Sequence, residues 1–184
     1  MEDFVLSSEQ GGEILSIATL YKREAKKCFR AKAYLSGCVL MGAAMEALLF
    51  SAINCFPWKI ASVKCAPKSK GEIKRLDRWT FSELLAVAIE LNLLPSGLSS
   101  EDKWSSAHAK IGDYANLVRK IRNLIHPVRY VNDFSRKRVT KKYLEACFVI
   151  VDAAADYLYL LVSTSLKIML EEKERRSAHR KLLT

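Results

Sequence analysis

Residues 117–127 bring together side chains that can bind a phosphate and move a proton. Arg119, Arg122, Asn123 and His126 all fall within about two helical turns of one another. On a helix, residues that are three, four or seven apart lie on nearly the same face. The spacing therefore predicts a polar stripe in which Arg119, Arg122 and His126 converge, with Asn123 beside it.

This combination of residue types favours cleavage of RNA without a metal ion. A histidine titrates near neutral pH and can act as a general base or a general acid. An adjacent arginine can bind a phosphate and stabilise the charge that develops on it. Because RNA supplies its own nucleophile, the 2′-hydroxyl group, His126 with Arg119 or Arg122 predicts an in-line transesterification that leaves a 2′,3′-cyclic phosphate.

A structural role explains the same residues equally well. Pro127 disfavours a helical backbone at His126, so the histidine is expected at the helix C-terminus, where the terminal carbonyls favour its protonated form. His126 would then only cap the helix. The arginines would pair with acids of other helices, because a buried carboxylate needs a partner, and the candidates are Glu46, Asp152 and Asp156.

Charge and cysteine content narrow the range of partners and locations. The 184 residues include 30 Lys and Arg against 20 Asp and Glu, a net charge of +10, which favours nucleic acid, an acidic protein or an anionic membrane surface as the partner. The five cysteines are scattered without a CxxC pair, so we expect no zinc site, no disulfide framework and a cytoplasmic location. Without a Gly-rich phosphate loop, HExxH, GxSxG or EF-hand motif, no metal and no cofactor are expected.

Two apolar segments, residues 33–56 and 148–170, are each long enough to span a bilayer. Glu46 lies in the middle of the first, and two aspartates and Lys167 interrupt the second. Uncompensated charges are expensive in lipid. The sequence therefore favours buried helices in a soluble bundle and no membrane partner.

The chain is expected to be all-α, with one domain over residues 1–184. Ser7 with Gln10, and Thr80 with Glu83, match the capping box that begins a helix. The fold class that we predict is an up-and-down bundle of four to five helices with a long C-terminal helix. The first expected helix begins near Ser7, the second covers about residues 31–56, and the third runs from Thr80 to before Pro95. Two further helices are expected over about residues 99–125 and 140–170. Residues 58–78 are expected to form a basic loop, and residues 171–184 a charged tail.

The segment Arg122-Asn123-Leu124-Ile125-His126-Pro127, near the end of a bundle helix, resembles the HEPN (higher eukaryotes and prokaryotes nucleotide-binding) superfamily. Members of that superfamily carry an arginine, often followed by a polar residue such as asparagine, and a histidine that is separated from the arginine by four to six residues. Arg122 has the expected Asn123 but is separated from His126 by three residues. Arg119 has six intervening residues but is followed by Lys120, so either arginine can be the functional one.

The resemblance covers roughly residues 31–170 and implies a small helical domain that works as a homodimer. In such a dimer the motifs of two subunits meet in one cleft, so the site would contain two copies of Arg119, Arg122, Asn123 and His126. The basic loop and a cluster near the start of the last helix would flank this site and bind the RNA backbone. That cluster consists of Arg129, Arg136, Lys137, Arg138, Lys141 and Lys142.

Two functions follow from these observations. The first is a metal-independent endoribonuclease of a toxin–antitoxin or phage-defence system, whose partners are RNA and a nucleotidyltransferase antitoxin or another defence protein. The second is a catalytically inactive HEPN-like module that binds RNA or a protein through its basic face. The biological context in the first case is implied by the resemblance alone.

Overall fold

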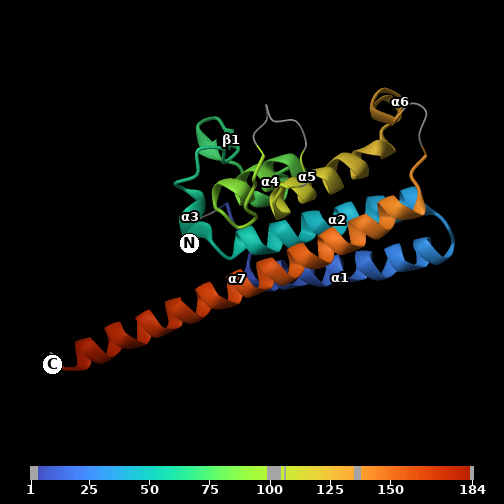
Figure 1. Cartoon of the computed structure of the whole chain (residues 1–184). Helices are drawn as coiled ribbons and strands as arrows, with labels where there is room; N and C mark the ends of the chain where they lie inside the picture. Colours follow the sequence, from blue (N-terminus) through green and yellow to red (C-terminus); the bar gives the residue numbers. More distant parts are fainter. Residues whose placement is uncertain (1–3, 99–104, 106, 135–137, 183–184) are drawn as a thin grey trace.

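The computed structural model describes residues 4–98, 105, 107–134 and 138–182, and it confirms the all-α class with a long C-terminal helix. Figure 1 shows three long helices running alongside one another: α1 (Ser8–Arg30), α2 (Tyr34–Asn54) and α7 (Lys141–Leu182). The shorter helices α4 (Phe81–Glu90) and α5 (Ile111–Arg122) also pack against α2. The backbone of α7 continues as a helix into the expected charged tail.

Helix α2 is the central helix, because α1, α4, α5 and α7 all contact it. Its fully buried side chains include Met41, Met45, Leu49 and Ile53. By length and composition alone, α2 and residues 141–169 of α7 could each cross a membrane, which is weak evidence for a span. The most apolar window of α2 is 61% buried, so the bundle core accounts for its composition, whereas that of α7 is 22% buried.

Residues 31–33 form the turn between α1 and α2. The predicted start near residue 31 is wrong, since α2 begins at Tyr34. The cause is Lys32, whose φ of 57° lies in the left-handed region that a right-handed helix cannot contain. The chain therefore reverses within about one turn, so the C-terminal end of α1 and the N-terminal end of α2 lie together at one end of the bundle (Figure 1).

Residues 57–78 are more ordered than a simple basic loop. They form the short helix α3 (Pro57–Ile60), an antiparallel hairpin of β1 (Lys68–Ser69) and β2 (Glu72–Ile73), and a 3₁₀ turn, η1 (Leu76–Arg78). Contacts to α4 hold the segment in place: Lys74 pairs with Glu83 at 2.6 Å, and Glu90 accepts the N–H groups of Lys64 and Cys65. The sequence predicted only a loop at residues 58–78, so this hairpin was not expected.

Both predicted capping boxes are present, but the helix expected to begin at Ser99 is much shorter. The Oγ atoms of Ser7 and Thr80 accept the N–H groups of Gln10 and Glu83, which satisfies donors that the first turn of a helix leaves free. The expected first turn at residues 99–102 lies outside the described residues, and α5 begins at Ile111.

Asp113 fixes the start of α5. This buried carboxylate accepts the N–H groups of Gly97 and Lys110 at 2.7 and 2.8 Å and the hydroxyl group of Ser96. Burial acts to raise the pKa of Asp113, but the hydrogen bonds outweigh it and hold the pKa below the ordinary value of 3.8. The ionised carboxylate therefore stabilises the fold above the pKa of the unfolded chain, and this stabilisation is lost as the pH falls through the lower pKa of the folded state.

We expect Asp113→Ala to lower the free energy of unfolding by about 1–3 kcal/mol near pH 7, because several donors lose their acceptor. Urea unfolding at pH 7 and at pH 3 measures the effect, and the gap between wild type and variant should narrow at the lower pH. Asp156→Ala, at an exposed position, is the control and should leave stability nearly unchanged. An equal gap at both pH values would contradict the assigned role of the charge.

Candidate functional site

The predicted motif lies at a corner between two helices. Helix α5 ends at Arg122, Asn123–Ile125 form a 3₁₀ turn (η2), and His126 has an extended backbone with φ −80° and ψ 118°. Pro127 then begins α6 (Pro127–Phe134), a helix that we did not expect. Proline at the first position of a helix forfeits no hydrogen bond, so Pro127 starts a new helix as well as interrupting the preceding one.

Arg122 is bound to an acid of the central helix. Its Nη2 atom lies 3.0 Å from Oε2 of Glu46, and its Nη1 atom lies 3.5 Å from Oδ1 of Asn123. Both charged side chains are largely covered, at 29% and 27% exposure. Burial raises the pKa of the Glu46 carboxyl group, while Arg122 and the N–H group of Phe81 act to lower it. The structural pairing with Glu46 is therefore present.

A glycine of α2 makes this pairing possible. A Cβ atom added to Gly42 would lie about 2.4 Å from Cβ and 2.5 Å from Cγ of Arg122, closer than real side chains approach. The absence of a side chain at this position lets α5 pack directly against α2. Arg122 can then reach Glu46, which lies one helical turn after Gly42 and therefore on nearly the same face.

Arg119 is in a different environment from Arg122. Its Nε atom donates to Oδ1 of Asn116 at 3.0 Å, and in the described residues its terminal nitrogens have no acidic partner. Burial lowers the pKa of the Arg119 guanidinium, and the positive charge of Arg129 lowers it further. The turn at the corner thus brings Arg129 of α6 within electrostatic range of Arg119, which the sequence spacing alone did not indicate.

His126 itself is exposed, and its imidazole makes no hydrogen bond or ion pair with any residue that the structure describes. Its backbone N–H donates to the carbonyl oxygen of Asn123 at 3.1 Å. The side chain is therefore held at the corner by its backbone and is accessible from solvent. The structure consequently divides the predicted stripe into a Glu46–Arg122–Asn123 network, an arginine pair formed by Arg119 and Arg129, and the exposed His126 at the corner.

The predicted backbone-binding cluster lies at the same end of the bundle. Arg129, Arg138, Lys141 and Lys142 are exposed, whereas Arg136 and Lys137 lie outside the described residues. The hairpin of the predicted basic loop lies toward the opposite end of α2 (Figure 1), a helix of 21 residues that is roughly 30 Å long. Its place in the fold therefore does not support the expectation that it flanks the motif.

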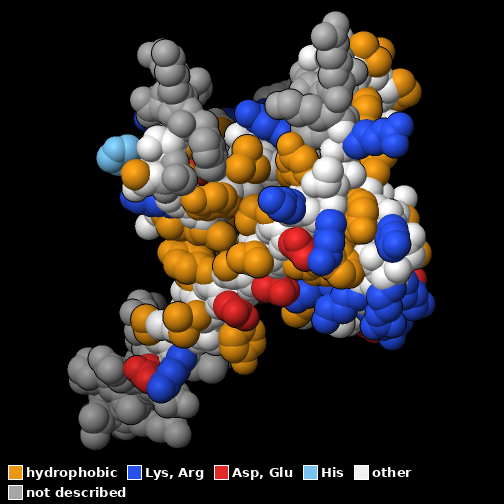
Figure 2. Space-filling view, turned by 45° about the vertical axis from the view of Figure 1, so that its right-hand side comes forward, with side chains coloured by type: hydrophobic (Ala, Val, Ile, Leu, Met, Phe, Trp, Pro, Cys, Tyr) orange, Lys and Arg blue, Asp and Glu red, His pale blue; other side chains and the backbone are white. Residues whose placement is uncertain are grey.

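Sequence reasoning missed the basic half of α1 as a part of this surface. The end of α1 lies beside the start of α7, because Lys141 lies over the ring of Phe29 and Phe148 packs against the same ring. The basic side chains of α1 therefore join those of α7. Figure 2 brings this end forward and shows Lys and Arg side chains gathered on one side of it. The exposed residues that α1 and the following turn contribute are Arg23, Lys26, Lys27, Arg30 and Lys32.

The described residues contain no group of three or more His, Cys, Asp or Glu side chains that could hold a metal ion. Comparison with known proteins gave no match to any protein-family model, curated protein or solved structure. The corner between α5 and α6 and the basic surface around it are thus the features from which a function can be argued.

Proposed function

We propose that the corner at His126 is the active site of a HEPN-like, metal-independent endoribonuclease. The observation that carries the proposal is the ion pair between Arg122 and Glu46. Because this pair neutralises Arg122, Arg119 is the arginine of the motif that is available to an anion. Arg119 also has the spacing to His126 that resembles the superfamily, with six intervening residues.

Arg119 and Arg129 are suited to bind the phosphate group that is cleaved. Two guanidinium groups within electrostatic range repel each other, and an anion placed between them relieves that repulsion. A phosphate diester accepts hydrogen bonds from arginine in a fork geometry. The two guanidinium groups stabilise the transition state most, because the attacking oxygen then adds negative charge to the phosphoryl group.

His126 carries the proton transfers in this proposal. The imidazole takes the proton of the 2′-hydroxyl group as the 2′-oxygen bonds to phosphorus, and the bond from phosphorus to the 5′-oxygen breaks. In a composite dimer site, His126 of the second copy, in its protonated form, donates to the leaving 5′-oxygen. The products are a 2′,3′-cyclic phosphate and a 5′-hydroxyl group, and no metal is required.

A second copy has a suitable docking surface beside the corner. Ile125, Val128 and Val131 are 46%, 71% and 61% exposed; Val128 and Val131 lie three residues apart on α6, and Ile125 directly precedes His126 at the end of η2. Exposed apolar side chains grouped in this way are typical of an interaction surface. They support the homodimer that the resemblance implies, and they lie next to His126, where the two sites of a dimer would have to meet.

The biological role that we propose follows from the resemblance to the HEPN superfamily. We propose a cytoplasmic role in a toxin–antitoxin or phage-defence system, with a nucleotidyltransferase antitoxin or another defence protein as partner. A specific observation also keeps the inactive RNA-binding module as a second candidate: Arg122 and Asn123, which form the closest match to the superfamily motif, are both engaged in the Glu46 network.

We expect the purified protein to cleave single-stranded RNA in the presence of EDTA and to leave DNA of the same sequence intact, because the nucleophile is the 2′-hydroxyl group. Mass spectrometry of the fragments should find 2′,3′-cyclic phosphate ends. Full inhibition by EDTA would indicate a metal-dependent enzyme instead. Salt-sensitive RNA binding without cleavage would favour the inactive module.

A further inference from the structure

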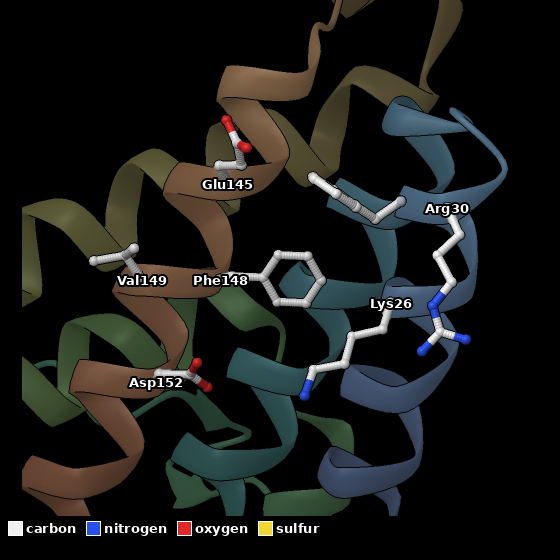
Figure 3. A pocket seen from close by; sticks show the side chains of 7 residues that line it. Lys26, Arg30, Glu145, Phe148, Val149 and Asp152 are labelled. Atoms are coloured by element: carbon white, nitrogen blue, oxygen red, sulfur yellow. The ribbon is translucent and has the colours of Figure 1, made fainter.

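A pocket lies between the end of α1 and the start of α7, at the same end of the bundle as the basic surface around the corner. Its volume is about 460 Å³, within the size range of small-ligand pockets. Each of the two helices contributes a phenylalanine and two charged side chains to the lining of the pocket (Figure 3). Lys26, Phe29 and Arg30 come from α1, and Glu145, Phe148 and Asp152 come from α7.

The floor of the pocket is aromatic. Phe29 and Phe148 are both partly buried, and their ring centroids lie 6.2 Å apart at an interplanar angle of 72°. Figure 3 shows the ring of Phe148 between the two helices, seen face on. An accessible aromatic face binds planar ring systems by stacking, and nucleic-acid bases stack on it whatever their sequence.

The wall of the pocket on α1 is positively charged and the wall on α7 is negatively charged, but only the charges on α7 are paired. Lys26 and Arg30 form the wall on α1, and neither makes an ion pair with a described residue. On α7, Glu145 pairs with Lys141 at 3.2 Å, and Asp152 pairs with Lys22. The cationic wall is therefore free to bind an anion, while the neutralised carboxylates can still accept hydrogen bonds.

A separate hollow of about 350 Å³ lies near both the pocket and the corner. This hollow is lined by Lys32 and Tyr34, by Tyr130 of α6 and by Arg138. Tyr34 packs edge-to-face against Phe29 at 6.3 Å, so the two hollows are neighbours. A strand bound at His126 can therefore pass over the hollow and reach the pocket across a surface of aromatic and basic side chains.

We propose that the pocket between α1 and α7 holds one nucleotide of a single-stranded RNA. The base stacks on Phe148, the phosphate lies against Lys26 and Arg30, and an exocyclic amino group of the base donates to Glu145 or Asp152. Carboxylates accept hydrogen bonds from such amino groups, which uracil lacks. Uracil can offer only its ring N3–H, which lies between two carbonyl oxygens that repel a carboxylate. The site therefore selects cytosine, adenine or guanine over uracil, and the assignment of RNA as the ligand rests on the proposed function.

The test measures binding of labelled C12 and U12 RNA by fluorescence anisotropy. Both are pyrimidine homopolymers, and they differ at the exocyclic group that the carboxylates would recognise. The full chain with His126→Ala is used so that cleavage does not interfere. We expect C12 to bind several-fold more tightly than U12, and the double variant Lys26→Glu/Arg30→Glu to weaken C12 binding about tenfold or more.

The matched control is Lys68→Glu/Lys70→Glu, which changes the net charge equally at two exposed positions of the hairpin. It should weaken binding much less. Phe148→Leu should weaken the binding of both C12 and U12, because stacking does not depend on the base, with circular dichroism reporting whether the variant is folded. Equal loss in the two charge variants, or equal binding of C12 and U12, would overturn the nucleotide pocket.

Two further outcomes separate this inference from the proposed function. If the wild type cleaves no RNA but the pocket variants lose selective C12 binding, the pocket stands and the nuclease does not. If the wild type cleaves RNA and the pocket variants bind C12 normally, the pocket is wrong and the nuclease stands. Binding to phosphatidylserine vesicles that depends on Lys26 and Arg30, without binding to C12, would assign the surface to a membrane instead.

Discussion

His126→Ala is expected to lower the rate of RNA cleavage by about 10²–10⁴-fold, the usual contribution of a positioned general acid or base. The effect should fall on chemistry and not on folding, because the side chain is exposed and bonds to no described residue. The far-UV circular dichroism spectrum and the melting temperature should therefore match those of the wild type. Initial rates on a fluorescently labelled single-stranded RNA measure the loss.

His108→Ala provides the control for this experiment. His108 is also exposed, but it precedes α5 and lies outside the corner, so its removal should leave cleavage unchanged. Undiminished cleavage by His126→Ala would exclude the catalytic role. A similar loss in both histidine variants would point to a general effect on folding or on the preparation.

The two arginines of the motif are expected to respond differently to substitution. Arg119→Ala should slow cleavage by about 10²–10³-fold, because a donor to the developing phosphoryl charge is lost. Arg122→Ala should act mainly on stability, because it leaves Glu46 partly buried without its partner. That loss is about 1–3 kcal/mol, or a fall in melting temperature of a few degrees for a chain of this size.

Calorimetry and cleavage rates measured on the same preparations separate these effects. The variant Arg122→Ala with Glu46→Gln should regain part of the lost stability, since the uncompensated charge is removed, and it should retain cleavage. The assignment is reversed if Arg122→Ala abolishes cleavage in a folded protein while Arg119→Ala leaves it intact. In that case the Glu46 pair would have to open when RNA binds.

Local signals predicted the helices well because they depend on residues close in sequence. The capping boxes at Ser7 and Thr80 and the apolar composition of α2 each express a rule that acts within a few turns. The late start of α5 could not be predicted in this way. It depends on Asp113 accepting a hydrogen bond from Gly97, 16 residues earlier in the chain.

The candidate site was predicted in its residue types but not in its pairings. Periodicity placed Arg119, Arg122 and His126 on one stripe, which assumed that a single helix continues to the histidine. The helix ends at Arg122, and the partner of Arg122 is 76 residues away in sequence. Glu46 was one of three acids that the sequence allowed, and the choice among them depends on how closely α5 approaches α2.

The choice of glycine at position 42 limits how this chain can change during evolution. Every other amino acid carries a Cβ atom, which would meet the stem of Arg122 and displace α5. A displaced α5 carries Arg119 and the corner with it, so a neutral-looking change in the middle of an apolar helix can alter the polar site without touching any polar residue. Relatives that keep the arginines and the histidine but carry a larger residue at the equivalent of position 42 would need compensating changes on α5.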